Sequence, residues 1–172
     1  MDTKKMVLNA ILIAIGVILH AISPSFGLPA QPDFALAMLF IIMLINRDYK
    51  TTIFAGIIIG IFTALTTKSP GGQLPNIIDK VITCNVMYLL MLPLREKVSN
   101  NIQGIILFVF GTLLSGTVFL TSLALISGVE GAILTTIFAV VVPTAVVNVI
   151  AGMIIYKIVE QAMRIKIGRA HV

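Results

Sequence analysis

Apolar residues lie along this chain in six long stretches, which short polar segments separate. A helix that crosses a bilayer needs about 20 predominantly apolar residues, and most of the stretches approach that length. They occupy residues 6–22, 33–46, 51–66, 77–94, 102–127 and 132–158. The second stretch is the shortest, and it ends at the charged run of residues 47–50. The pattern predicts an all-α membrane protein with six transmembrane helices in one bundle.

Composition strengthens this prediction. Hydrophobic residues make up 58% of the 172 residues and charged residues 11%, whereas about 25% of a soluble domain is charged. Together with a mean hydropathy of +1.08, these values exclude a soluble globular protein, a disordered tail and a nucleic-acid-binding domain, so we expect no nucleic-acid partner. The single cysteine, Cys84, excludes an internal disulfide and a cysteine-built metal site. The length predicts one domain, without a separate ATPase or catalytic domain.

The positively charged residues predict the orientation of the bundle. Six spans place both termini on one side of the membrane. That side and its loops carry Lys4, Lys5, Arg47, Lys50, Arg95, Lys97, Lys157, Arg164, Lys166 and Arg169. The opposite side carries Lys68 and Lys80. Because Lys and Arg concentrate in cytoplasmic loops, we expect both termini to be cytoplasmic and the chain to be a multi-pass protein of the bacterial cell membrane, in contact with lipid.

The last six residues, 167–172, read IGRAHV. A common sequencing adapter encodes this hexapeptide in one reading frame. We therefore expect residues 1–166 to form the single six-helix domain and residues 167–172 to be adapter read-through that is not natural. The charge asymmetry keeps its direction without Arg169.

Polar residues inside a bilayer are costly and therefore mark functional sites. In this chain they gather toward the predicted outer face, while the inner half has no comparable group. The candidate substrate-binding residues are Gln31, Asp33, Thr67, Gly71, Gly72, Gln73, Asn76, Asp79, Lys80 and Asn148. Their position suits a site that captures something from outside.

The segment after the third predicted helix is the most informative of these. Gly71 and Gly72 allow backbone N–H groups to approach a ligand, and Asn76 fits the N-cap of a helix, whose N-terminus attracts a carboxylate. Asp79 and Lys80 follow, and an acid beside a base matches the two ends of a zwitterionic amino acid. The alternative is a mutual ion pair, with Lys80 extended to the membrane interface.

For the remaining polar residues of the helices, a structural role is at least as well supported as a functional one. Asn85 and Asn148 fit hydrogen bonds between helices. His20 is either a structural hydrogen-bonding residue or a proton relay. Ser115 and Thr117 fit bonds to their own helix backbone. The sequence holds no Ser–His–Asp set, HExxH motif or P-loop, so we expect no enzyme, no cofactor and no metal.

Two pairs of small residues are spaced four apart. Gly56 and Gly60 on the third predicted helix allow a close approach of helices, and packing inside the bundle is the favoured interpretation. Ala10 and Ala14 lie in the predicted cytoplasmic half of the first helix, where a protein partner can dock.

Five segments carry a family resemblance when they are taken in order. They are residues 31–33 (QPD), 60–67 (GIFTALTT), 70–80 (PGGQLPNIIDK), 111–120 (GTLLSGTVFL) and 142–148 (VPTAVVN). Together they resemble the bacterial tryptophan transport protein family. The resemblance extends from about Lys4 to Arg164, and residues 70–80 are its most specific part. The tail departs from the family pattern.

That family is similar to the substrate-binding (S) components of energy-coupling factor transporters. The resemblance implies six helices with cytoplasmic termini, an outward-facing pocket covered by loops, and no ATPase of its own. It implies a transmembrane coupling subunit and two ATPase subunits as partners. The family docks on the coupling subunit through two alanines spaced four apart on the first helix, and Ala10 and Ala14 match them by position. Tryptophan as the substrate comes from the resemblance.

The roles of single residues toward tryptophan stay open. Lys80 with the backbone of Gly71 and Gly72 suits the carboxylate, and Asp79 or Asp33 suits the ammonium. The candidates for the wall around the ring are Phe26, Phe34, Phe62 and Met87. The candidates for accepting the indole N–H are Gln73 and Asn148.

The function that we infer from the sequence is tryptophan uptake by an S component of an energy-coupling factor transporter. One alternative is a homodimeric, proton-coupled secondary transporter of an aromatic amino acid or another small organic substrate. Asp33, Asp79 or His20 would then be the proton-coupling group. A membrane enzyme would need a nucleophile–base pair in the outer half, and a structural or sensory subunit would have no ligand-sized outer pocket.

Overall fold

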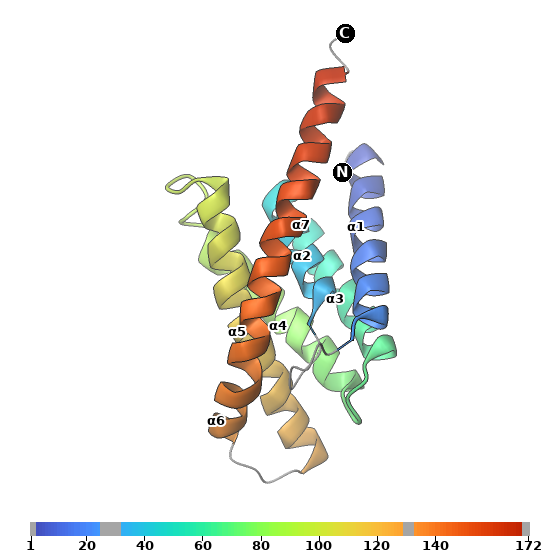
Figure 1. Ribbon diagram of the computed structural model, residues 1–172, viewed down its shortest axis with the longest axis vertical. Coiled ribbons are helices and arrows are strands. Elements are labelled where there is room, and N and C mark those ends of the chain that lie inside the picture. The colour runs from blue at the N-terminus through green and yellow to red at the C-terminus, as the bar shows by residue number, and fades with distance from the viewer. Residues whose placement is uncertain (1–2, 25–31, 129–132, 170–172) are drawn as a thin grey trace.

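The computed structural model describes residues 3–24, 32–128 and 133–169, and all regular structure in these ranges is helical (Figure 1). The helices are α1 (Thr3–Ile22), α2 (Phe34–Asn46), α3 (Tyr49–Thr66), α4 (Gln73–Met91), α5 (Asn100–Ser127), α6 (Ile133–Thr136) and α7 (Val142–Arg169). A π-helical turn, η1 (Ile137–Val141), joins α6 to α7, so the chain is helical throughout 133–169. The predicted all-α class is confirmed for the described residues.

The outer surface of the bundle is apolar. Five helical segments are long and apolar enough to cross a membrane, namely α1, α3, α4, α5 and Ile137–Met163. Large apolar side chains on each of them are exposed, among them Ile18, Phe54, Leu89, Phe110 and Ile150. Such a continuous surface suits lipid and is rare in soluble monomers. The number of crossings and the cytoplasmic position of the termini stay predictions.

Helix α2 lies in the middle of the bundle. Every residue from Ala35 to Met43 is buried, and α1, α3, α4, α5 and α7 all contact this helix. A helix that is apolar on all sides is stable only in such a position. Its 13 residues extend about 20 Å at 1.5 Å per residue. The core around it includes an edge-to-face pair between Phe40 and Phe108, with ring centroids 5.8 Å apart.

Several helix ends differ from the prediction. Helix α4 begins at Gln73, with Gly72 at the N-cap position, so the expected N-cap role of Asn76 is wrong. Instead, the Asn76 amide donates to the Gly72 carbonyl at 2.7 Å from inside the first turn. Pro75 fits this turn because the missing N–H would have no partner there. A prediction from hydropathy alone places the start of such a helix too late, because its first turn is polar.

Two predictions concern residues that lie partly or wholly outside the described ranges. Gln31 lies outside them, as do residues 170–172 of the predicted adapter read-through. The helix α7 extends to Arg169, beyond the predicted end of the sixth stretch. The division into residues 1–166 and 167–172 therefore stays a prediction.

Glycines set the distances between neighbouring helices. A Cβ atom at Gly56 would lie 2.5 Å from Sγ of Cys84, and one at Gly60 would lie 3.3 Å from Cα of Ile77, both on α4. The predicted packing role of Gly56 and Gly60 inside the bundle is thus confirmed. The side-chain oxygen of Asn85 on α4, for which a hydrogen bond between helices was predicted, accepts a hydrogen bond from the Tyr49 hydroxyl of α3 at 2.7 Å.

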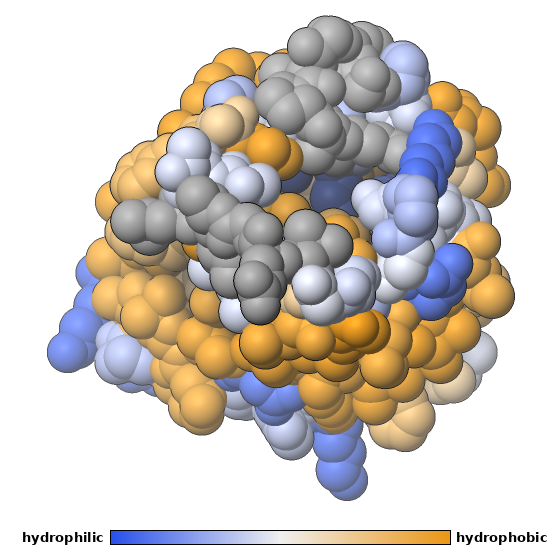
Figure 2. Space-filling view, turned by 90° about the horizontal axis from the view of Figure 1, so that it is seen from below, coloured by the Kyte–Doolittle hydropathy of each residue, from blue (hydrophilic) through white to orange (hydrophobic). Residues whose placement is uncertain are grey.

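The two ends of the bundle differ. In Figure 1, α1 begins and α7 ends toward the same end of the bundle. The opposite end, at the bottom of Figure 1, holds the end of α1, the start of α2, the α3–α4 connection and the end of α5. Figure 2 looks onto this opposite end and shows a hollow with hydrophilic atoms at its floor, surrounded by hydrophobic surface. We call it the cavity end.

Replacing Gly111 on α5 tests the close packing around α2. A Cβ atom there would lie 2.2 Å from the ring of Phe40, which is fully buried. We expect Gly111→Ala to lower the free energy of unfolding by about 1–3 kcal/mol through overpacking, measured as a lower thermal midpoint of the purified protein in detergent. Gly104→Ala on the same helix is the matched control, because its Cβ would meet only ordinary contacts from 3.5 Å outward. Equal midpoints for the two variants would contradict the arrangement of α2 and α5.

Candidate functional site

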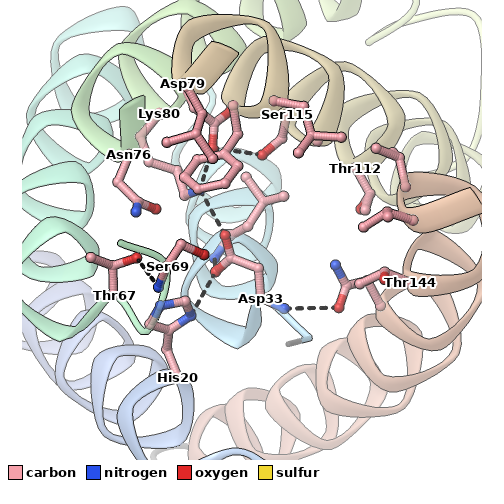
Figure 3. A pocket seen from close by; sticks show the side chains of 18 of the residues that line it. His20, Asp33, Thr67, Ser69, Asn76, Asp79, Lys80, Thr112, Ser115 and Thr144 are labelled. Atoms are coloured by element: carbon pink, nitrogen blue, oxygen red, sulfur yellow. Dashed lines mark hydrogen bonds and ion pairs between the residues drawn. The ribbon is translucent and has the colours of Figure 1, made fainter. Parts of the chain in front are cut away.

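A cavity opens at the cavity end of the bundle. Its volume is about 510 Å³, within the range of about 300–1,000 Å³ that is usual for small-molecule sites. Side chains from α1, α2, the α3–α4 connection, α4, α5, η1 and α7 line it. The lining combines charged and hydroxyl side chains, the most prominent of which are labelled in Figure 3, with apolar side chains.

The charged side is built around Lys80 of α4. Its ammonium forms ion pairs with Asp79 of the same helix and with Asp33 at the start of α2, 2.7 Å from the Asp33 carboxylate. The side chains of Lys80 and Asp79 are each 1% exposed, and that of Asp33 is 17% exposed. When all three are ionised, two carboxylates against one ammonium leave this charge cluster (Asp33, Asp79 and Lys80) with an excess negative charge. The cluster therefore favours a cationic group as an additional ligand.

Asp33 has partners on four helices, and its ion pair with Lys80 is the contact with α4. Its carboxylate caps α2 by accepting the Leu36 N–H at 3.0 Å, as expected for a good N-cap residue. Its backbone N–H donates to the Asn148 amide oxygen on α7 at 2.9 Å. Nδ1 of His20, at the end of α1, lies 3.3 Å from the same carboxylate. The position of Asp33 thus depends on α1, α2, α4 and α7 together.

Asp79 is held in the same manner from α4 and α5. Its carboxylate accepts hydrogen bonds from the hydroxyl of Thr83 at 2.9 Å and from the hydroxyl of Ser115 at 2.8 Å. A buried charge is tolerated only when it is paired and hydrogen-bonded. These contacts meet that condition, and they connect α5 to the charge cluster.

Part of the cavity lining is apolar. Phe119, Leu120 and Leu123 of α5 and Val140 and Val141 of η1 form this part, and we call these five residues the apolar wall. Ligand sites typically combine such a wall with a few polar groups that set orientation. The cavity therefore has the form of a site for an amphipathic small molecule.

A second lysine lies at the edge of the cavity. Lys68, in the connection between α3 and α4, lines the cavity and donates a hydrogen bond to the Ser23 carbonyl after α1 at 2.7 Å. The Lys68 side chain is exposed, and no carboxylate of the described residues pairs with it. It is thus an available cation at the mouth of the cavity.

The structure brings together most, but not all, of the expected site residues. Those that line the cavity are Asp33, Thr67, Asn76, Asp79, Lys80 and Asn148. Gly71 and Gln73 are exposed and are not part of the lining, nor is Gly72, whose N–H donates to the Ser69 carbonyl at 3.0 Å. Gln31 lies outside the described residues.

Two expectations about polar side chains need correction. The mutual ion pair of Asp79 and Lys80, considered as the structural alternative, is present, but Lys80 does not extend to the interface, because the two carboxylates hold it inside the bundle. Ser115 bonds to Asp79 rather than to its own helix, whereas Thr117 does bond to the backbone of its helix, at Leu113. Both differences arise from ion pairs and hydrogen bonds between helices, which the sequence of one helix does not predict.

The expected ring-binding residues lie elsewhere. Phe62 is exposed on the outer surface, Met87 is in the core, and neither they nor Phe34 line the cavity. Phe26 lies outside the described residues. The apolar wall that takes their place was missed, although Thr112, Ser115, Gly116 and Phe119 follow the helical spacing of one face of α5. These four residues line the cavity.

Three bacterial proteins named as probable tryptophan transport proteins are similar to this chain. The protein of Clostridium perfringens is 43% identical, over 95% of this chain and 94% of its own length. The protein of Clostridium acetobutylicum is 41% identical over 96% of both chains, and that of Bacillus subtilis is 42% identical over 95% of both. The family model described as tryptophan transporter TrpP matches residues 2–164. No solved structure matches the chain.

Removing the positive charge of the cluster tests its role in the fold. Lys80→Met leaves two buried carboxylates near one another without their cation, and we expect the free energy of unfolding to fall by about 3–5 kcal/mol. The triple variant Lys80→Met, Asp33→Asn, Asp79→Asn has no net charge there, and Asn at position 33 keeps the helix cap. It should recover most of the loss in thermal unfolding of the detergent-solubilised protein. A triple variant as unstable as Lys80→Met would refute the pairing.

Proposed function

The chain belongs to the tryptophan transporter TrpP family, and we propose that it serves tryptophan uptake as the substrate-binding component of an energy-coupling factor transporter. The observation that carries this proposal is the cavity, in which a charge cluster faces an apolar wall. A free amino acid with a large side chain needs both features at once.

The substrate ammonium is assigned to the carboxylates of the charge cluster. Asp33 and Asp79 outnumber the single ammonium of Lys80, and a substrate ammonium would neutralise the excess. Asp33 is the more accessible of the two, with its side chain 17% exposed. Lys80 then serves as the bridge that holds both carboxylates in place, rather than as the main partner of a substrate carboxylate.

The substrate carboxylate is assigned to Lys68. The Gly72 N–H, considered for this role from sequence, already bonds to Ser69. Lys68 lines the cavity, holds one carbonyl and has further N–H donors to offer, because an ammonium has three. A substrate seated this way would connect the α3–α4 segment to the start of α2, closing the mouth of the cavity.

Coupling to an ATP-driven module is assigned to α1. Ala10 and Ala14 are exposed on this helix, and small residues allow a partner helix to approach closely. Beside them lies a groove of about 580 Å³ between α1 and α3, lined by Ala10, Met6, Phe54 and Ile58 among others. The groove is at the end of the bundle opposite the cavity, so that in this proposal docking and substrate capture would occur at different ends. In this proposal a transmembrane coupling subunit and two ATPase subunits supply the energy.

Titration of the purified protein with tryptophan tests the substrate assignment. We expect one tryptophan per chain, with weaker competition from tyrosine and phenylalanine, in titration calorimetry. Lys68→Met should weaken binding about tenfold or more through loss of a charge-assisted bond, whereas Lys97→Met, an exposed lysine away from the cavity lining, should leave it unchanged. Absence of binding to any aromatic amino acid would overturn the substrate, and equal affinities of the two variants would overturn the role of Lys68.

Bulky residues on α1 test the coupling assignment. Ala10→Leu with Ala14→Leu should abolish tryptophan uptake by cells but leave the affinity of the purified protein unchanged, because the docking face and the cavity are separate. Ala162→Leu, at an exposed alanine of α7, is the matched control and should transport normally. Uptake should also stop when ATP is depleted while the proton gradient is kept. Continued uptake under that condition would favour the proton-coupled alternative, with Asp33, Asp79 or His20 as the proton-coupling group.

A further inference from the structure

The apolar side of the cavity contains a buried hydroxyl group with nothing to bond to. Thr144 of α7 lines the cavity and is 7% exposed, and its Oγ1 atom has no hydrogen-bond partner among the described residues. We propose that Thr144 is the specificity-determining residue of the site and that its hydroxyl accepts the N–H of the substrate indole. This inference rests on the proposed function, because it presupposes that tryptophan occupies the cavity.

An unpartnered buried hydroxyl is unusual enough to require a reason. Burying such a group without a bond costs about 1–3 kcal/mol, and buried polar groups are nearly always paired. The buried hydroxyls of Thr63, Thr83 and Ser115 in this protein follow the rule. Thr144 does not even bond to the carbonyl one turn earlier in its own helix, the usual solution for a threonine. The oxygen itself has almost no accessible surface in this structure, so a ligand donor reaches it when the Thr144 side chain rotates about its Cα–Cβ bond and exchanges its methyl and hydroxyl groups. A ligand that supplies a donor in this way explains why the hydroxyl group is kept.

The backbone before Thr144 is shaped to present it. Pro143 has no N–H and cannot bond to the carbonyl four residues earlier, and the preceding turn widens into η1, where the Val142 N–H reaches the Ile137 carbonyl. Such π-helical turns often occur at functional sites. Here the turn places Val140 and Val141 in the apolar wall and Thr144 directly after it. The widened turn therefore combines a flat apolar surface with one acceptor.

The neighbouring helix α5 is fitted closely to this turn. A Cβ atom at Gly116 would lie 2.6 Å from Cγ1 of Val141, so only glycine allows the present distance between α5 and η1. Phe119 follows on the same face of α5 and lines the cavity. An aromatic ring between Phe119 and Val141 would have apolar contacts on two sides.

The position of Thr144 relative to the charge cluster suits an indole. In Figure 3, Thr144 and Thr112 lie on the side of the cavity away from His20 and Thr67, with Asp33 between the two sides. A substrate anchored through its ammonium at Asp33 would extend its side chain toward Thr144. The two acceptors considered from sequence do not serve as well, because Gln73 is outside the cavity lining and the Asn148 oxygen already accepts the Asp33 N–H.

A hydrogen bond of this kind discriminates strongly. A site that is built to bond to a polar substrate group leaves its own group unpaired when that group is missing, and it thereby rejects the analogue. Phenylalanine lacks the donor entirely. Tyrosine carries its donor at the far end of its ring, farther from the backbone than the indole N–H of tryptophan. The hydroxyl therefore explains how a largely apolar slot can prefer tryptophan.

The test compares L-tryptophan with 3-benzothienyl-L-alanine, in which sulfur replaces the indole N–H and the ring shape is kept. Both ligands are titrated into the purified wild-type protein and into Thr144→Val, which removes the hydroxyl with little change of shape. We expect the wild type to prefer tryptophan about tenfold or more. In Thr144→Val, tryptophan affinity should fall by a similar factor, benzothienylalanine affinity should stay within about twofold, and the preference should approach one.

Further variants and outcomes make the test decisive. Thr144→Ser keeps the hydroxyl and should keep the preference, whereas Thr144→Ala, a second variant without the hydroxyl, should lose it even if Thr144→Val does not fold. A wild type that binds both ligands equally, or a Thr144→Val variant that keeps the tenfold preference, would overturn the role of Thr144 while leaving tryptophan binding intact. A wild type that binds neither ligand would instead overturn the proposed function, and the role of Thr144 with it.

Discussion

A buried ammonium stays charged only beside anionic neighbours, and Lys80 has two of them, Asp33 at the head of α2 and Asp79 in α4. Each carboxylate in turn holds other helices: Asp33 reaches α1 and α7, and Asp79 reaches α5. In a bilayer, apolar surfaces alone do not drive helices together strongly, because lipid is equally apolar. The geometry of the cavity end therefore depends on this cluster. The apolar side chains around α2 pack between the helices that the cluster holds together.

The two ends of α2 show how one short helix connects different parts of the bundle. At the cavity end its first turn is capped by Asp33. At the other end Asn46 exchanges hydrogen bonds with Asn9 of α1 at 2.9 Å and 3.3 Å, close to the groove beside Ala10. Between them lies only packed apolar surface. A shift of α2 along its axis would thus affect the cavity and the α1 surface together, because both ends are held by specific polar bonds.

The sequence predicted the features that follow from one-dimensional patterns. The apolar stretches located the first five long helices to within about four residues at each end, although α7 extends to Arg169, well beyond the predicted end. The polar residues of the outer half located six of the residues that line the cavity. The sequence pattern did not predict features that depend on how neighbouring helices pack. Asn76 has the chemistry of an N-cap, but Pro75 allows the helix to begin earlier. The ring-binding candidates Phe34, Phe62 and Met87 were chosen by residue type, yet the face that a side chain presents depends on neighbouring helices, and α5 and η1 form the wall instead.

The burial of α2 has a consequence for the biogenesis of this protein. A stretch of 13 residues is short for independent insertion by the translocation machinery, which recognises segments of about 20 apolar residues. Its neighbours α5 and α7 are synthesised later than α2 itself, and they cover it only once they have emerged from the ribosome. Until then α2 and the carboxylate of Asp33 must be sheltered by α1, by α3 and α4 as they emerge, or by a chaperone in the membrane. Helix α7 therefore contributes, after α2 has been made, both to the envelope of α2 and to the lining of the cavity.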